Sequence, residues 1–204
     1  MEKFDKRNFD TTHIKETMGL SGKYVFTLVT RLLWEKGIRE AIEALQIVAK
    51  KHPNIVFLIV GDEDGHNPRS VTQDYIKNFE TNENIRFVGK KSNINEILAA
   101  TDVYLYPSYY REGIPRSVLE ALATGIPIVT TNMPGCNLTV IEKQNGLLIE
   151  PKSKEAIVEA VNWMIENKEN WASMGLKSRE LAQKEFSDTM IYSQIESIYA
   201  SLYA

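Results

Sequence analysis

The sequence predicts an α/β fold: a Rossmann-like, doubly wound parallel sheet with helices on both faces and extra helices at the C-terminal end. Short β-branched and aromatic runs alternate with amphipathic helical segments between residues 24 and 149. Three helical segments then follow Pro151 with no strand between them. The chain has 204 residues, of which 43% are apolar and 25% charged, so it can bury a core without disulfides or metals.

The first half of the chain begins with polar residues 1–22, which we expect to form an irregular lead-in. The run YVFTLVT over residues 24–30 predicts a buried strand. Residues 37–51 place Ile38, Ile42 and Leu45 on one face of an amphipathic helix. The further elements expected here are a strand over 55–60, a helix over 68–80, a strand over 85–88 and a helix over 94–100.

The second half continues the alternation and then changes character. A strand is expected over 103–106, and a helix over 115–123 has Pro115 in its first turn, where the missing N–H has no consequence. The last helix carries an apolar stripe of Ile and Tyr residues that normally indicates core packing. The other expected elements are strands over 126–130 and 147–149 and helices over 154–166, 169–185 and 188–203.

Charge and cysteine content exclude several classes of function. Lys and Arg number 24 against 27 Asp and Glu, and a net charge of −3 argues against a general nucleic-acid partner. The single cysteine, Cys136, cannot form an intrachain disulfide. No apolar run is long enough to span a bilayer, and the first residues lack a signal-peptide region. His13, His52 and His66 have no metal-ligand spacing, so we expect no metal site.

Parallel sheets bind ligands at the carboxyl ends of their strands, so the loops after residues 30, 60, 88 and 106 are the places to search. Arg31 and Lys36 lie between a strand end and a helix start, where they would clamp a diphosphate. The alternative is two solvated surface charges. The next loop, 61–65, begins with Gly61 and is acidic, so an ordinary acidic turn is the simpler interpretation.

The loop after the fourth strand carries the strongest signal. Glu112 precedes the expected helix and Glu120 lies within it, so the two carboxylates would bracket the free N–H groups near Ser117 and Val118. A carboxylate can hold a vicinal diol and a helix N-terminus suits a phosphate. A diol-binding carboxylate, a phosphate-binding helix start and a second diol-binding carboxylate in line fit the ribose, the diphosphate and the hexose of a nucleotide-sugar. The alternative makes Glu120 an exposed residue and Glu112 part of a helix cap.

Two further features of these loops have structural interpretations. The aromatic side chains Tyr104 and Tyr106 are explained by core packing, whereas Tyr109 or Tyr110 could line a pocket. Cys136 has no partner base nearby in the sequence, so a small loop residue is expected there rather than a nucleophile.

Several motifs together resemble one family in order and spacing, the group 1 (family four) glycosyltransferases, which are retaining, nucleotide-sugar-dependent enzymes of the GT-B fold. The resemblance covers roughly residues 23 to 165. It implies that residues 1–22 follow an interdomain linker and that residues 23–204 form the donor-binding C-terminal half of a longer enzyme. The matching segments are TRLLWEKG, VGD after the second strand, NIRFVGK, ATDVYLYPSYYREGIPRSVLEALATGIPIVTT and QNGLLIEP.

The resemblance implies roles for individual residues. Arg31 and Lys36 match the basic pair that holds the donor diphosphate. Glu112 matches the first glutamate of the family pair, which contacts the donor sugar, and Glu120 the second, which holds the ribose. The remaining implied substrate-binding residues are Ser117, Val118 and Leu119 at the phosphate-binding helix start, Lys90 and Lys91 at the base, and Gly61, Gly113 and Arg116 within the matching motifs.

The implied function is metal-independent transfer of a hexose or N-acetylhexosamine, with retention, from a nucleotide-sugar to a glycan or lipid-linked acceptor in surface polysaccharide synthesis. The implied partner is an N-terminal acceptor-binding domain, which the last helix commonly contacts in this fold. Because this chain has one such domain, the apolar stripe on residues 188–203 must pack locally, stay exposed or meet another chain. We expect a cytoplasmic location, with peripheral attachment to the inner face of the membrane as a second expectation. The alternatives are a GT-B nucleotide-sugar epimerase and a non-catalytic nucleotide-binding module.

Overall fold

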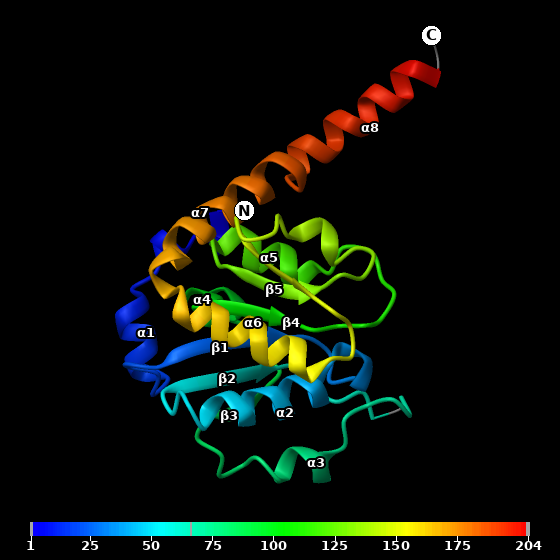
Figure 1. Cartoon of the computed structure of the whole chain (residues 1–204). Helices are drawn as coiled ribbons and strands as arrows, with labels where there is room; N and C mark the ends of the chain where they lie inside the picture. The colour runs from blue at the N-terminus through cyan, green and yellow to red at the C-terminus, as the bar shows by residue number, and fades with distance from the viewer. Residues whose placement is uncertain (1, 66, 203–204) are drawn as a thin grey trace.

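The computed structural model, which describes residues 2–65 and 67–202, contains a six-stranded parallel sheet (Figure 1). Its strand order is β3-β2-β1-β4-β5-β6, so the chain winds outward from β1 in one direction and from β4 in the other. This order confirms the predicted Rossmann-like class. The strands are β1 (Tyr24–Val29), β2 (Ile55–Val60), β3 (Ile85–Gly89), β4 (Val103–Tyr106), β5 (Ile128–Thr131) and β6 (Gly146–Ile149).

Helices cover both faces of the sheet, as the continuous apolar strands predict. All six residues of β2 are buried, which requires apolar neighbours on each side. On one face α2 (Ile38–Ala49) packs against α6 (Lys154–Glu166). On the other face α4 (Ile94–Ala99) contacts both α1 (Thr11–Thr17) and α5 (Arg116–Thr124) (Figure 1).

Three expected elements differ from the structure. The lead-in is not irregular, since it contains α1 and two short 3-10 turns, Glu2–Phe4 and Lys6–Asn8. The helix expected over 68–80 is only α3 (Gln73–Lys77), because residues 69–71 instead bond to the backbone of the loop after β1. β5 also begins two residues later than expected, since the Ile126 N–H bonds back to the end of α5.

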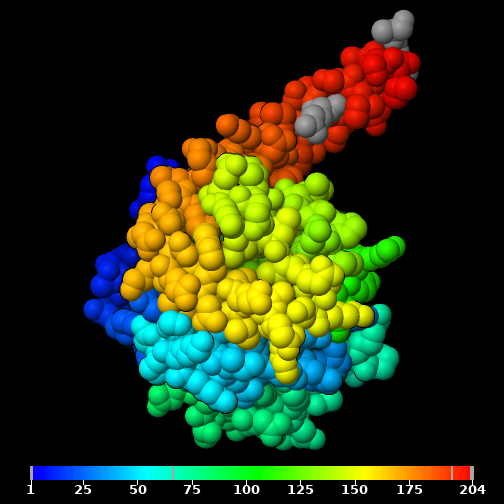
Figure 2. All heavy atoms as spheres, viewed as in Figure 1, coloured from blue at the N-terminus to red at the C-terminus, as the bar shows by residue number. Residues whose placement is uncertain are grey.

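The chain ends in two helices, α7 (Trp171–Glu185) and α8 (Asp188–Leu202), which differ in their packing. α7 packs against α5, whereas α8 extends away from the body of the domain (Figures 1 and 2). The predicted apolar stripe on α8 is therefore exposed rather than part of a core. None of the described helices has the length and apolar character needed to cross a membrane. The exposed stripe consists of Ile191, Ile195, Ile198, Tyr199 and Leu202.

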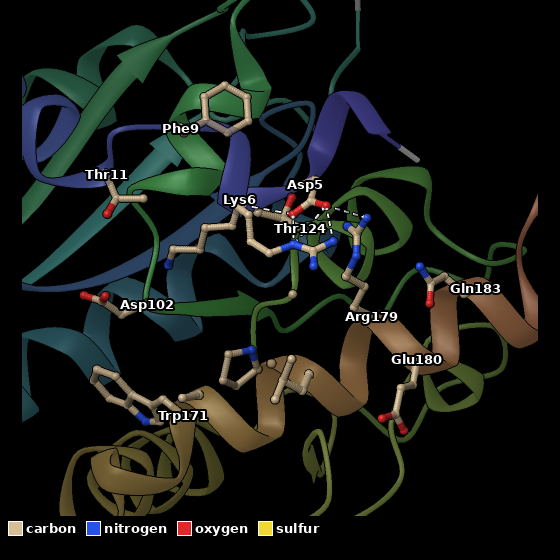
Figure 3. A pocket seen from close by; sticks show the side chains of 16 residues that line it. Asp5, Lys6, Phe9, Thr11, Asp102, Thr124, Trp171, Arg179, Glu180 and Gln183 are labelled. Carbon is tan, nitrogen blue, oxygen red and sulfur yellow. Dashed lines mark hydrogen bonds and ion pairs between the residues drawn. The ribbon is translucent and has the colours of Figure 1, made fainter.

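Ion pairs attach the N-terminal residues to the domain. Asp5 contacts Arg7 at 2.6 Å and Arg179 of α7 at 2.9 Å (Figure 3). Lys15 of α1 contacts Asp102, which directly precedes β4, at 2.8 Å. These contacts couple the start of the chain to α7 and to the amino ends of the strands.

A cavity of about 720 Å³ lies beside these ion pairs, at the amino ends of β4 and β5 (Figure 3). Its walls combine the Trp171 indole with the charged side chains of Lys6 and Arg179. None of the predicted site residues lines it, because those residues follow the carboxyl ends of the strands.

We predict that Asp5 contributes to stability in a pH-dependent way. Hydrogen bonds from the Arg7 side chain, helped by its backbone N–H and the Arg179 charge, lower the pKa of Asp5 to about 2 against the opposing effect of burial. The pKa is thus lower in the folded than in the unfolded state. The Asp5 contribution to the free energy of unfolding is complete at pH values above about 4, the pKa of an aspartate in the unfolded chain. It is lost as the pH falls toward 2.

Urea unfolding over this pH range tests the prediction with Asp5→Asn. The variant should be less stable than the wild type at neutral pH, and its stability should fall less steeply with acid. Asp74→Asn is the matched control, because the Asp74 side chain is 93% exposed. Identical pH slopes for the two variants would show that the Asp5 contacts do not hold in solution.

Candidate functional site

A crevice is expected where the strand order reverses, between β1 and β4. The loops that leave these two neighbouring strands at their carboxyl ends lead to helices on opposite faces of the sheet. The predicted site residues come mainly from these two loops. Of these residues, Lys36 and Glu112 meet at this point of the sheet.

The loop after β1 places Lys36 at the switch point between β1 and β4. Lys36 ends a short 3-10 turn, and Gly37 follows it in the left-handed conformation with φ 73°. A Cβ atom at Gly37 would overlap the carbonyl oxygen of Pro107 in the loop after β4. Glycine therefore lets the two loops touch, and the Lys36 side chain is left only 6% exposed.

Lys36 forms an ion pair with Glu112 across the two loops. Glu112 Oε1 lies 2.6 Å from Lys36 Nζ and accepts hydrogen bonds from the Tyr106 hydroxyl at 2.9 Å and the Ser108 hydroxyl at 3.3 Å. Lys36 Nζ also donates to the Tyr106 hydroxyl at 3.1 Å. The second oxygen of Glu112, Oε2, has no hydrogen-bond partner among the described residues.

The neighbours of this pair have shifted protonation equilibria. Burial, followed by the charge of Glu112, raises the pKa of Tyr106 above its ordinary value, so its hydroxyl stays protonated and donates. Burial also raises the pKa of Cys136, which is fully buried. A thiol in this state is a weak nucleophile, which agrees with the structural role predicted for it.

Gly135 supports the loop that carries Glu112. It adopts φ 85°, and a Cβ atom there would overlap the carbonyl oxygen of Gly113 and lie 2.7 Å from that of Glu112. Gly113 itself has open space where a side chain would be. The backbone after β5 therefore packs directly against the backbone at Glu112, and only glycine at position 135 allows this approach.

Glu120 lies in helix α5, which follows the loop that carries Glu112. Glu120 is 19% exposed and lies 3.1 Å from Arg116 Nε, one turn earlier and 91% exposed. The interpretation of Glu120 as a simple exposed residue is thus wrong. The interpretation of Glu112 as a helix cap is also wrong, because Pro115 occupies that position and Glu112 is bound to Lys36.

The start of α5 has fewer free donors than expected. The N–H groups of Val118 and Leu119 both donate to the Pro115 carbonyl, at 3.0 and 3.2 Å. The N–H of Ser117 has no backbone partner within residues 2–65 and 67–202. The predicted free N–H at Val118 is therefore engaged, whereas the Ser117 N–H is among the donors at this helix start that have no backbone partner in the described part of the chain.

Arg31 lies apart from the Lys36–Glu112 pair. Its side chain is 66% exposed and contacts Asp64 at 3.4 Å. The acidic turn that follows β2 thus provides a partner for this cation. Gly61 in that turn has φ 149°, and a Cβ atom there would overlap the Thr30 carbonyl oxygen, so it keeps the ends of β1 and β2 close.

Lys90 and Lys91 follow the edge strand β3, and both are exposed. Two strands, β2 and β1, lie between β3 and β4. Three strand spacings amount to about 14 Å, so these lysines do not join the Lys36–Glu112 pair. Their assignment to the base-binding wall stays a prediction.

Sequence reasoning missed three members of the site, namely Tyr106, Ser108 and Gly135. Tyr106 is indeed in the core, as predicted, but its hydroxyl also bonds to Glu112. The sequence feature that could have identified Tyr106 as a site residue is its position at the carboxyl end of β4, two residues before Ser108. Gly135 gives no signal in the sequence, because its role depends on a loop contact distant along the chain.

Within the described part of the chain, no group of three or more His, Cys, Asp or Glu side chains could hold a metal ion. His66 lies outside the described residues.

The fold and the site together define a class: an α/β domain with a buried lysine–glutamate ion pair at the β1–β4 switch point. The family model for glycosyl transferases group 1 matches residues 10–181. The chain therefore belongs to the group 1 glycosyltransferases, as the sequence motifs indicated.

Individual relatives agree with this assignment. The chain is 26% identical over 198 residues to the capsular polysaccharide biosynthesis glycosyltransferase CapM of Staphylococcus aureus, covering 96% of this chain and 51% of CapM. It is 32% identical to the UDP-Gal:alpha-D-GlcNAc-diphosphoundecaprenol alpha-1,3-galactosyltransferase of Escherichia coli, covering 72% of this chain and 38% of that enzyme. The chain spans about half the length, or less, of these curated relatives.

Solved structures share the fold. HepE of Anabaena in complex with UDP matches with a TM-score of 0.82 and 24% identity, over 97% of this chain and 56% of HepE. The C-terminal domain of the group 1 glycosyltransferase LpcC from Francisella tularensis matches with a TM-score of 0.75 and 24% identity, over 90% of this chain and 98% of that domain. The second match spans almost the whole of that C-terminal domain.

We predict that Gly135→Ala destabilises the domain by about 2 kcal/mol or more, because it combines left-handed strain with overpacking. Chemical unfolding measures the effect. Gly113→Ala, on the other side of the same contact, is the matched control: a side chain there meets nothing within 4 Å. Equal stability of the two variants would contradict the packing described for the Glu112 loop.

Proposed function

We propose that the chain is the donor-binding half of a retaining glycosyltransferase that moves a hexose or N-acetylhexosamine from a nucleotide-sugar to a glycan or lipid-linked acceptor. The observation that carries the proposal is the buried Lys36–Glu112 pair at the β1–β4 switch point. The pair brings a cation and a carboxylate together at the carboxyl ends of β1 and β4, the position at which sheets of this topology bind ligands.

The chemistry follows from the charges. As the sugar leaves, negative charge grows on the departing diphosphate. Lys36, Arg31 and the N-terminus of α5 would stabilise it in place of a divalent metal, which is catalysis by preorganised electrostatics. We assign a ribose contact to Glu120 and a contact with the donor sugar to the free Oε2 of Glu112. Glu112 then orients the sugar while the acceptor hydroxyl approaches from the face that the diphosphate leaves.

Relatives support the choice of donor and acceptor. HepE is described with UDP and with UDP-glucose, which supports a UDP-sugar for this chain. The Escherichia coli relative and one from Campylobacter jejuni act on diphosphoundecaprenol-linked sugars, and CapM acts in capsule synthesis. We therefore propose a lipid-linked acceptor, a role in surface polysaccharide synthesis that includes lipopolysaccharide, and a cytoplasmic site of action at the inner membrane face.

Titration calorimetry with UDP and GDP tests the clamp. Losing a hydrogen bond to a charged group costs about 1.5–3 kcal/mol, so Arg31→Ala should weaken binding about tenfold or more, and the double variant with Lys36→Ala further. The exposed Arg31 can be removed without disturbing the core, which separates binding from folding. Lys51→Ala, at the far end of α2, is the control and should bind as the wild type does. Addition of EDTA should change nothing.

If neither nucleotide binds more weakly to the double variant than to the wild type, the clamp assignment is wrong. If EDTA abolishes binding, the metal-independent mechanism is wrong.

We predict that the chain alone binds donor but transfers little sugar, because the acceptor would be held by a second domain. Incubation with radiolabelled UDP-sugars and an undecaprenyl-diphosphate-linked sugar measures transfer directly. Multiple turnovers by the 204-residue chain would contradict the assignment of the acceptor site to another domain.

A further inference from the structure

The hydrogen bonds at the Lys36–Glu112 pair form a closed triangle with Tyr106. An ammonium group has three N–H donors. Lys36 gives one to Glu112 Oε1 and one to the Tyr106 hydroxyl. The Tyr106 hydroxyl has a single proton, which it donates to the same Glu112 oxygen at 2.9 Å. One N–H of Lys36 and one oxygen of Glu112 are left over.

Tyr106 is the rigid corner of this triangle. Its side chain is buried and lies on β4, where its ring stacks on that of Tyr104 at a centroid distance of 6.3 Å. Its carbonyl oxygen accepts a hydrogen bond of 2.7 Å from the buried Thr130 hydroxyl of β5. Lys36 and Glu112, in contrast, reach the triangle from loops. Groups held by a sheet are placed more accurately than groups on loops.

We propose that Tyr106 is a positioning residue of the donor site, whose hydroxyl fixes the Lys36 ammonium and the Glu112 carboxylate relative to each other. It directs the third Lys36 N–H and Glu112 Oε2 to the ligand. This role rests on the proposed function, since it assigns the diphosphate to the first group and the donor sugar to the second.

The surroundings of Lys36 Nζ agree with a third N–H that is available to a ligand. The centre of the Tyr110 ring lies 5.0 Å from Lys36 Nζ, and this ring is itself partly exposed to solvent. A phosphate oxygen can reach Lys36 by displacing this loop side chain. Tyr106 is buried, so on this proposal its contact with Lys36 persists during that exchange.

The test compares Tyr106→Phe with Tyr104→Phe. Both substitutions remove one hydroxyl from a buried tyrosine of the same strand and keep the ring. The Tyr104 hydroxyl bonds to the backbone of Val29 and not to Lys36 or Glu112. A merely structural role for the hydroxyl would therefore give the two variants the same behaviour.

Two measurements are made on the full chain. The first is the NMR signal of the Lys36 ammonium, assigned with Lys36→Arg and observed without ligand. We expect a slowly exchanging signal in the wild type and in Tyr104→Phe, and its loss to solvent exchange in Tyr106→Phe. The second is the affinity for UDP, UDP-glucose and UDP-N-acetylglucosamine, which should fall about tenfold in Tyr106→Phe and remain within about twofold in Tyr104→Phe.

The two measurements separate the two proposals. If the ammonium signal is the same in both variants, Tyr106 does not position Lys36. The inference is then overturned whatever the measured nucleotide affinities are. If the signal is lost but the affinities are unchanged, the contact exists without serving a donor, which also overturns it. If the wild type binds none of the three probes, the proposed function fails, while the ammonium signal still decides whether Tyr106 holds the pair.

Discussion

The ion pair between Lys36 and Glu112 is the interaction on which the rest of the site depends. A buried ammonium loses its hydration, and it is tolerated in a protein interior only when it is paired and hydrogen-bonded. Here the two charges come from loops after different strands, so the pair forms only when β1 and β4 are neighbours. The pair thereby couples the topology of the sheet to the position of the reactive groups.

Close backbone approach makes this pairing possible. Gly37 brings the loop after β1 against Pro107, and Gly135 brings the loop after β5 against Glu112 and Gly113. In both places a Cβ atom would overlap the opposing backbone and force the loops apart. The geometry of the charged groups is thus fixed by glycines that carry no chemistry of their own, and the rigid sheet beneath them supplies Tyr106.

Local patterns in the sequence predicted most of the fold and part of the site. Buried strands such as Ile55–Val60 are short apolar runs, and periodicity alone locates them. The length of helix α3 was overestimated because residues 69–71 bond to Leu32 and Trp34. No local pattern in the sequence indicates such a distant partner. The same limit applies to the site. The loops that hold Lys36 and Glu112 were identified from the strand ends, but their pairing with each other depends on strand order, which spacing does not encode.

The two cations of the proposed clamp differ in the strength of their present contacts, and this difference suits them to different tasks. Glu112 already neutralises Lys36, so Lys36 alone cannot balance the charge of a diphosphate. Among the described residues, the partner of the Arg31 side chain is Asp64, at 3.4 Å in an exposed position, and such surface pairs contribute about 0–1 kcal/mol. Exchanging Asp64 for a phosphate therefore costs little, whereas breaking the Lys36–Glu112 pair would leave a buried charge uncompensated. On the proposed function, Lys36 is the fixed element against which the donor is aligned, and Arg31 is the mobile element that supplies the remaining positive charge when the donor arrives.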